Sequence, residues 1–130
     1  MFASGTVEIR RDVVAKVLCV GLGGGYLNSY LHHHFPKMDI TIVELDPMML
    51  RIARKWFGLD EDHRQRVIID DGLNYIKRAA ESGIQYGVVH LDVCTTDPNA
   101  KHNCPLDVFV SEDALSVLSK LINRRGRDSM

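Results

Sequence analysis

Cysteines are few in this chain and odd in number. Three of them, Cys19, Cys94 and Cys104, occur among 130 residues. Small secreted domains usually carry an even, dense set of cysteines that pair into a disulfide framework, whereas free thiols are typical of a reducing compartment. The cysteine content therefore argues against a disulfide-stapled secreted domain and predicts a cytoplasmic location.

Net charge and long hydrophobic runs are also lacking. Sixteen basic residues oppose seventeen acidic ones, and the resulting net charge of −1 provides no overall field that would attract nucleic acid or an anionic membrane. The apolar runs have the length of strands and fall short of the ~20 residues that a membrane-spanning helix needs. Residues 1–5 lack the charged and apolar regions of a signal peptide. We expect partners other than nucleic acid and membrane.

What the chain does contain is a globular composition. Hydrophobic residues make up 45% of it and charged residues 25%, and its length suits a single core. We divide it into an N-terminal extension (1–13), one partial domain (14–122) and a tail (123–130). The tail shows no apolar periodicity, so we expect it to be disordered.

Short β-branched segments alternate with helical patterns along the domain. The predicted strands are residues 15–20, 40–44, 67–70 and 85–92. The predicted helices are residues 25–35, 47–57 and 72–82, and a last helix that Ser111 caps and that holds Leu115, Leu118 and Leu121. Strands separated by helices pair in parallel through crossovers. The sequence therefore predicts an α/β protein with a Rossmann-like, doubly wound parallel sheet, whose fourth strand lies at an edge.

Each predicted helix has an apolar side that we expect to face the sheet. The first three sides consist of Leu27, Tyr30, Leu31 and His34; of Met48, Met49, Ile52, Ala53, Trp56 and Phe57; and of Leu73, Ile76, Lys77 and Ala80. Basic residues on the second helix, Arg51, Arg54 and Lys55, are expected to face solvent.

The first predicted strand runs into a cluster of glycines. Apolar residues lead without a break to Gly21, and Gly23 and Gly25 follow before the first helix. Glycines let the chain turn without Cβ clashes and come close to a ligand. The next strand ends in Glu44, whose carboxylate can accept hydrogen bonds from both hydroxyls of a ribose. The pattern predicts a site for a nucleoside-containing cofactor, and by itself it also fits an NAD-dependent enzyme.

Two further strands end in acidic residues. Asp70, Asp71 and Gly72 follow the third strand, and Asp92 ends the fourth. Because open α/β sheets bind ligands at the carboxyl ends of their strands, we expect all these residues to border one site. Asp71 is also suited to cap the helix that follows it, as is Asp46 at the start of the preceding helix.

A metal site is not predicted. His32, His33 and His34 are consecutive, and neighbours on a helix point about 100° apart, so the three rings cannot meet at one ion. Cys94, His102 and Cys104 share a loop, but their spacing matches no familiar zinc pattern and a fourth ligand is missing.

These motifs resemble class I S-adenosylmethionine-dependent methyltransferases of the spermidine-synthase-like subgroup. The likeness covers roughly residues 14–121 and rests on Val-Gly-Leu-Gly-Gly-Gly at 20–25, His-His-Phe-Pro-Lys at 33–37, Val-Glu-Leu-Asp-Pro at 43–47, Trp-Phe-Gly at 56–58 and Asp-Gly-Leu-Asn-Tyr-Ile at 71–76. Within the subgroup these strings are most similar to methyltransferases of translation elongation factor 1-alpha. The resemblance implies S-adenosyl-L-methionine as cofactor, a protein substrate methylated on an amine, and a fold truncated here to the first four strands of a seven-stranded sheet.

The resemblance also implies a role for each site residue. It implies that Gly21, Gly23 and Gly25 line the methionine portion of the cofactor and that Glu44 binds the ribose. Leu45, Asp71 and Gly72 would contact the adenine, and Asp92 would close the acceptor side. Asp92 is the one predicted catalytic residue, as a base for the acceptor amine. A structural role for Asp92 stays open.

Two alternative functions stay open as well. Aminopropyltransferases of polyamine synthesis, in the same subgroup, carry an aspartate in the glycine turn that holds the amino group of decarboxylated S-adenosylmethionine, and Gly24 stands at that position here. That aspartate would repel a cofactor bearing a carboxylate, so Gly24 favours methyl transfer. The other alternative is a non-catalytic truncated remnant, because the tail stands where a further strand is expected.

Overall fold

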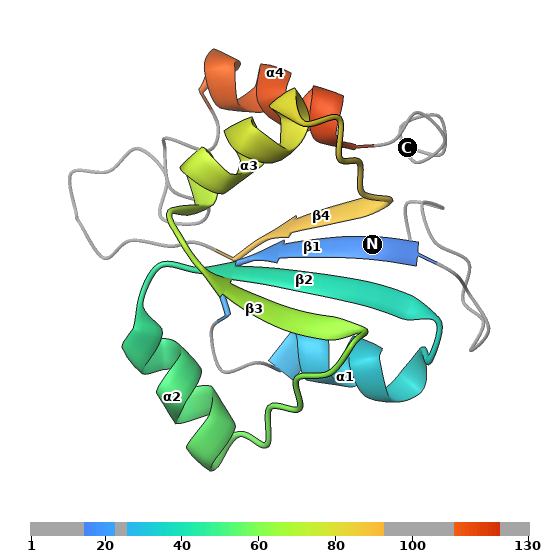
Figure 1. Cartoon of the computed structure of the whole chain (residues 1–130), viewed down its shortest axis with the longest axis vertical. Coiled ribbons are helices and arrows are strands. Elements are labelled where there is room, and N and C mark those ends of the chain that lie inside the picture. Colours follow the sequence, from blue (N-terminus) through green and yellow to red (C-terminus); the bar gives the residue numbers. More distant parts are fainter. Residues whose placement is uncertain (1–14, 23–25, 93–110, 123–130) are drawn as a thin grey trace.

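The computed structural model, which describes residues 15–22, 26–92 and 111–122, alternates strands and helices in the predicted order (Figure 1). The strands are β1 (Ala15–Val20), β2 (Met38–Glu44), β3 (Gln65–Ile69) and β4 (Val88–Leu91). The helices are α1 (Tyr26–His34), α2 (Pro47–Trp56), α3 (Gly72–Glu81) and α4 (Glu112–Leu121). Strands β2 and β3 begin before the predicted residues 40 and 67, and β4 is shorter than the predicted 85–92. The predicted extension 1–13 and tail 123–130 lie outside the described residues.

The four strands form one parallel sheet in the order β3-β2-β1-β4. Val17 of β1 pairs with Ile40 of β2 on one side and with Val88 of β4 on the other. The chain thus builds outward from β1 to β3 and then returns to the opposite side of β1. Open α/β sheets bind ligands at the carboxyl ends of the strands where such a reversal occurs.

Strand β4 is an edge strand in the part of the chain that the structure describes, as predicted. Its side of the sheet is extended by a parallel bridge between Tyr86 and Ile122, in which the N–H of Tyr86 donates to the carbonyl of Leu121 at 2.9 Å. Ile122, the residue after α4, therefore pairs with the segment that leads into β4.

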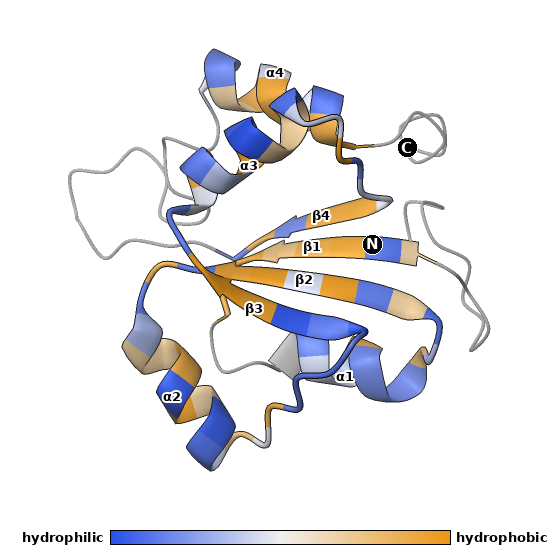
Figure 2. Cartoon of the chain, viewed as in Figure 1, coloured by the Kyte–Doolittle hydropathy of each residue, from blue (hydrophilic) through white to orange (hydrophobic). Residues whose placement is uncertain are grey.

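Helices cover both faces of the sheet, with α1 and α2 on one face and α3 and α4 on the other (Figure 1). This is the predicted doubly wound arrangement. Successive residues of a strand point to opposite faces, so β1 contributes Val17 and Cys19 to one core and Leu18 and Val20 to the other. The central strands are accordingly hydrophobic over most of their length (Figure 2).

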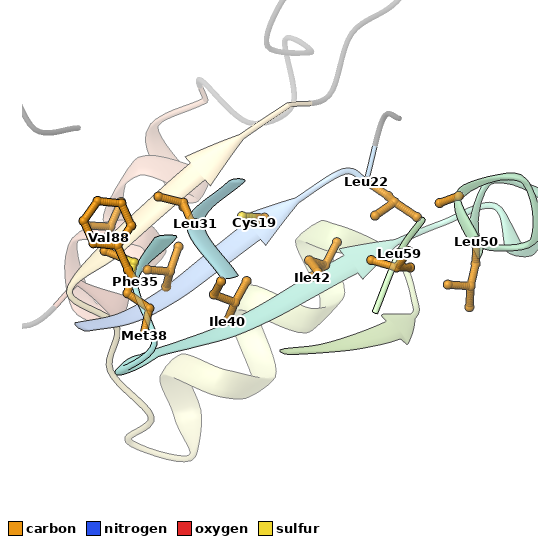
Figure 3. Packing of buried hydrophobic residues seen from close by; sticks show 12 residues of the cluster. Cys19, Leu22, Leu31, Phe35, Met38, Ile40, Ile42, Leu50, Leu59 and Val88 are labelled. Carbon is orange, nitrogen blue, oxygen red and sulfur yellow. The ribbon is translucent and has the colours of Figure 1, made fainter. Parts of the chain in front are cut away.

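Two clusters of buried residues fill the spaces between helices and sheet. The first, shown in Figure 3, joins the sheet to α1 and α2 through Leu31, Phe35, Leu50 and Ala53. The second joins it to α3 and α4 through Ile76, Ala79, Leu118 and Leu121. The site described below lies at the end of a sheet that is packed on both sides.

The predicted apolar side of α2 was wrong in part. Leu50 and Ala53 are its buried residues, whereas Trp56 and Phe57 are 70% and 56% exposed and Met48 is 51% exposed. Apolar residues occupy more than half of the circumference of this helix, and the sheet contacts only a narrow stripe of them. The basic residues Arg51, Arg54 and Lys55 are exposed, as predicted.

The other helices show smaller differences of the same kind. In α1, Leu31 is buried but Tyr30 and His34 are exposed, and the side chain of Leu27 lies outside the described part. In α3 the stripe consists of Ile76 and Ala79 rather than Lys77, which is exposed, and in α4 Ala114 takes the buried place predicted for Leu115. In α1 and α3 the buried stripe is rotated by about one residue from the predicted one, because the sheet contacts only one side of each helix. In α4 the predicted Leu118 and Leu121 are buried.

Candidate functional site

The carboxylate of Glu44 joins the turn after β1 to the start of α2. Its Oε1 accepts a hydrogen bond from the backbone N–H of Leu22 at 2.9 Å, and its Oε2 accepts one from the backbone N–H of Asp46, also at 2.9 Å. Each oxygen of a carboxylate can accept about two hydrogen bonds. Glu44 is therefore held in one orientation by the backbone and retains accepting capacity for a ligand.

The turn after β1 starts at Gly21. Its φ is +97°, a conformation that glycine adopts readily and residues with a Cβ rarely do. The N–H of Gly21 donates to the carbonyl of Val43 at 2.8 Å, which fixes the turn to the end of β2. The two other predicted glycines, Gly23 and Gly25, lie outside the described residues.

Leu45 and Asp46 separate Glu44 from α2. Leu45 is 68% exposed beside the polar Glu44, so its side chain is open to a flat apolar group of a ligand. Asp46 is a helix cap, as predicted: its Oδ1 accepts from the N–H of Met48 at 2.9 Å, and Pro47 occupies the first helical position.

The turn from β3 into α3 lies beside Glu44. The N–H of Asp70 donates to the carbonyl of Glu44 at 3.0 Å, and the side chain of Asp70 forms an ion pair with Arg78. Asp71 caps α3 as predicted, with Oδ1 accepting from the N–H of Asn74 at 3.0 Å. Asp71 is exposed, and its Oδ2 accepts no hydrogen bond from the described residues, which leaves an acceptor available near Gly72.

Asp92 lies at the point where the strand order reverses. Its N–H donates to the carbonyl of Val20 at 2.8 Å, so it stands beside the last residue of β1, and its side chain is exposed. The neighbouring thiol of Cys19 is buried. Burial, and after it the negative charge of Asp92, raise the pKa of Cys19 to about 12. Cys19 is thus a neutral core residue, and the charged group at this position is Asp92.

Hydrogen bonds between neighbouring turns bring the predicted residues to one edge of the sheet. Gly21 bonds to the end of β2, Asp70 to Glu44, and Asp92 to the end of β1. Sequence reasoning missed the N–H of Leu22, which orients Glu44. No signal in the sequence could reveal it, because every residue except proline carries such a donor.

The three consecutive histidines do not point toward a common site. His32 pairs with Asp62 at 2.8 Å, while His33 and His34 are exposed. Among the residues described, no group of three or more His, Cys, Asp and Glu could hold a metal ion. No helix in these ranges is long and apolar enough to cross a membrane. The loop with Cys94, His102 and Cys104 lies outside the described part.

Comparison with known proteins shows the family of the chain. The family profile described as "Spermine/spermidine synthase domain" matches residues 7–126. The chain is 40% identical over 117 residues to the "eEF1A lysine and N-terminal methyltransferase homolog" of Drosophila melanogaster, and 38% identical over 122 residues to the human "eEF1A lysine and N-terminal methyltransferase". These matches include 90% and 92% of this chain but only 17% and 18% of the relatives.

A solved structure has the same architecture. Human methyltransferase-like protein 13, in complex with SAH, superposes with a TM-score of 0.82 at 40% identity, over 87% of this chain and 52% of that one. The sheet topology and this likeness define the chain as a Rossmann-like α/β domain of the methyltransferase type. More closely, the chain belongs to the spermine/spermidine synthase domain family.

Proposed function

We propose that the chain is part of an S-adenosyl-L-methionine-dependent protein methyltransferase that methylates an amine, with eukaryotic elongation factor 1-alpha as the substrate. The observation that carries the proposal is Glu44, which two backbone N–H groups hold at the mouth of the turn after β1. The proposal draws further support from the names and the identity of the relatives. The low cysteine content supports a cytoplasmic location.

The polar groups of the site fit this cofactor. Ribose hydroxyls and an exocyclic amine are donors, and Glu44 and Asp71 both offer acceptor oxygens. A phosphate would instead require donors, and the one cation that the described residues bring to this edge, Arg78, is already paired with Asp70. In the proposal Glu44 binds the ribose, Leu45 lies on the adenine, Asp71 and Gly72 bind the adenine amino group, and Gly21, Gly23 and Gly25 border the methionine portion.

When bound, the cofactor supplies a sulfonium methyl group together with its leaving group. The chain has to orient the acceptor, exclude water and remove a proton from the acceptor ammonium so that the nitrogen lone pair is available. Asp92 is the exposed carboxylate at the point where the strand order reverses, and in the proposal its side chain accepts this proton from the ammonium. Its backbone bond to Val20 would keep that carboxylate at a constant position.

Binding of S-adenosylhomocysteine, measured by calorimetry, tests the cofactor assignment. We expect saturable binding, no binding of NAD, and loss of affinity in Glu44→Gln. This variant keeps one carbonyl acceptor but cannot accept from both N–H groups. The matched control is Glu81→Gln at the end of α3, which should bind like the original chain because Glu81 is exposed away from the site.

Transfer of labelled methyl to elongation factor 1-alpha then tests the activity. Failure of S-adenosylhomocysteine to bind a demonstrably folded chain would contradict the cofactor assignment and support a non-catalytic domain. Binding with no transfer to the factor would leave the cofactor site intact and reject the substrate.

An aminopropyltransferase of polyamine synthesis is the second candidate, and the description of the matched family favours it. Gly24 argues against it, since that position carries an aspartate in these enzymes. Polyamine formation from decarboxylated S-adenosylmethionine, without methyl incorporation into protein, would replace our proposal with this function.

A further inference from the structure

Helix α2 carries an exposed apolar strip that the proposed cofactor site does not use. Met48, Ile52 and Trp56 are spaced four residues apart, so they lie on one side of the helix over about 12 Å. Met48 is 51% exposed, Trp56 is 70% exposed, and Ile52 is half-buried. Leu50 and Ala53 already occupy the side of the helix that faces the sheet. The strip therefore adds nothing to the core.

A basic strip runs beside the apolar one. Arg51 and Lys55, four residues apart, are both exposed, and the ammonium of Lys55 lies 5.2 Å from the centre of the Trp56 ring. Arg54 pairs with Glu61 at 2.7 Å, but neither Arg51 nor Lys55 forms an ion pair with a described residue. Helix α2 contains no acidic residue. The outer side of α2 is thus half apolar and half cationic.

We propose that this surface, Met48, Ile52 and Trp56 bordered by Arg51 and Lys55, binds a helical segment of another protein whose apolar face is flanked on one side by carboxylates. Tryptophan, methionine and arginine are enriched where proteins meet, and an exposed tryptophan is a common centre of binding energy. The unpaired cations make this surface positively charged, and only carboxylates beside the apolar face of the partner helix complement that charge.

A membrane fits the surface less well. Interfacial helices insert a whole apolar side into the lipid, whereas the sheet already takes up the most deeply apolar side of α2 and leaves a strip three side chains long. The chain as a whole carries a charge of −1 and is not drawn to anionic lipid. A short strip of this kind suits a weak, transient protein contact.

The proposal is independent of the proposed function. Leu45, which precedes α2, belongs to the adenine side of the cofactor site, and the strip runs from there away from Asp92 at the opposite end of the binding edge. Binding of the partner should therefore not depend on whether the chain transfers methyl groups.

Trp56 reports directly on this surface because it is the only tryptophan in the chain. Two synthetic helical peptides without tryptophan serve as probes. Both carry apolar residues four positions apart, and they differ only in whether glutamates or lysines flank them. We expect the glutamate peptide to shift the emission of Trp56 to shorter wavelength in a saturable way that weakens with added salt. The lysine peptide should have no effect.

Charge-reversal variants distinguish this surface from general attraction. Arg51→Glu combined with Lys55→Glu should weaken binding of the glutamate peptide about tenfold or more, because attraction becomes repulsion. The matched control is Lys37→Glu combined with Lys77→Glu, which changes the net charge equally at exposed positions outside α2. The control should bind normally, and both variants should melt like the original chain.

Three outcomes would overturn the proposal. Equal responses to the two peptides, or none, would show that the surface does not select an acidic partner. A shift of Trp56 emission on vesicles of phosphatidylcholine and phosphatidylserine, without a peptide response, would indicate a membrane contact. A shift that depends on the concentration of the chain alone would indicate a second copy as the occupant.

Discussion

Cys19 and Asp92 are neighbours with opposite relations to solvent, since the thiol is buried and the carboxylate is exposed. Only the thiolate reacts with alkylating reagents. Because the pKa of Cys19 rises from 9.0 to about 12, its thiolate fraction at neutral pH falls about a thousandfold. In a Cys94→Ser, Cys104→Ser variant, where Cys19 is the sole thiol, we expect iodoacetamide to react far more slowly with the folded chain than with the unfolded one.

The charge of Asp92 accounts for part of this protection. Asp92→Asn should therefore move the pH profile of alkylation towards lower pH, whereas Asp113→Asn, on α4, should leave the profile unchanged. An unchanged profile in Asp92→Asn would mean that the carboxylate does not face the thiol, and would weaken the placement of Asp92 at the strand reversal.

Asp62 lies in the loop before β3 and binds three donors. Burial opposes ionisation, but the N–H of Arg64 at 2.8 Å, His32 at 2.8 Å and the N–H of Gln65 at 2.9 Å together lower the pKa of Asp62 from 3.8 to about 2. A carboxylate with a lowered pKa stabilises the folded state above its usual pKa, and this stabilisation is lost as pH falls towards the lowered value.

We therefore expect Asp62→Asn to lower Tm most at neutral pH. The difference in Tm between the original chain and the variant should begin to shrink as pH falls below about 4 and should continue to shrink through about 2, because Asp62 then becomes protonated in the folded chain as well. Thermal melts followed by circular dichroism across this range provide the measurement, with Glu81→Gln as the exposed control. A difference that is constant with pH would show that shape, and not charge, is what Asp62 contributes.

At the scale of elements, the start of α3 combines a cap with a proposed ligand contact. Asp71→Ala removes the acceptor for the N–H of Asn74 and should lower the free energy of unfolding by about 1 kcal/mol. Asp71→Ser keeps a capping oxygen and should cost only a few tenths of that. If Asp71 binds the adenine amino group, both variants should lose affinity for S-adenosylhomocysteine to a similar degree.

Helix α4 provides the control for this comparison. Its cap, Ser111, accepts from the N–H of Ala114 at 3.2 Å, and Ser111 is not among the residues that we assign to the ligand. Ser111→Ala should destabilise the chain about as much as Asp71→Ala, by about 1 kcal/mol, without changing ligand affinity. Urea denaturation and calorimetry measure the two effects separately. Normal binding by Asp71→Ser would restrict Asp71 to capping.

At the scale of the whole molecule, two cores share one sheet. Ile42 belongs to the cluster under α1 and α2 and Ile76 to the cluster under α3, and both are fully buried. Removal of one methyl group from each, in Ile42→Val and Ile76→Val, should lower the free energy of unfolding by about 0.5–1.5 kcal/mol apiece. The effects should add in the double variant because the two sites lie on opposite faces.

Unfolding should nevertheless remain a single transition, because β1 supplies residues to both clusters. Urea melts followed by circular dichroism and by the emission of Trp56 should coincide for the original chain and all three variants. Two separate transitions would mean that the faces unfold independently, contrary to the shared sheet.

The order and type of the elements, the position of Glu44 at the end of β2, and the caps Asp46 and Asp71 could all be predicted from the amino-acid sequence. These features depend on residues within about four positions of each other, through hydrogen bonds to the next turn and through local periodicity. The arrangement of these turns along the carboxyl edge of the sheet was predictable for the same reason, since each turn follows its own strand.

Packing between distant segments determines which side of each helix is buried and how the turns at the carboxyl edge are hydrogen-bonded to one another. Trp56 and Leu50 are both apolar. Trp56 is 70% exposed and Leu50 is buried, because the sheet packs against only one side of α2. The N–H of Leu22 reaches Glu44, 22 positions away, because parallel pairing of β1 with β2 brings their ends together. Such contacts arise from packing between distant segments, which local propensity does not encode.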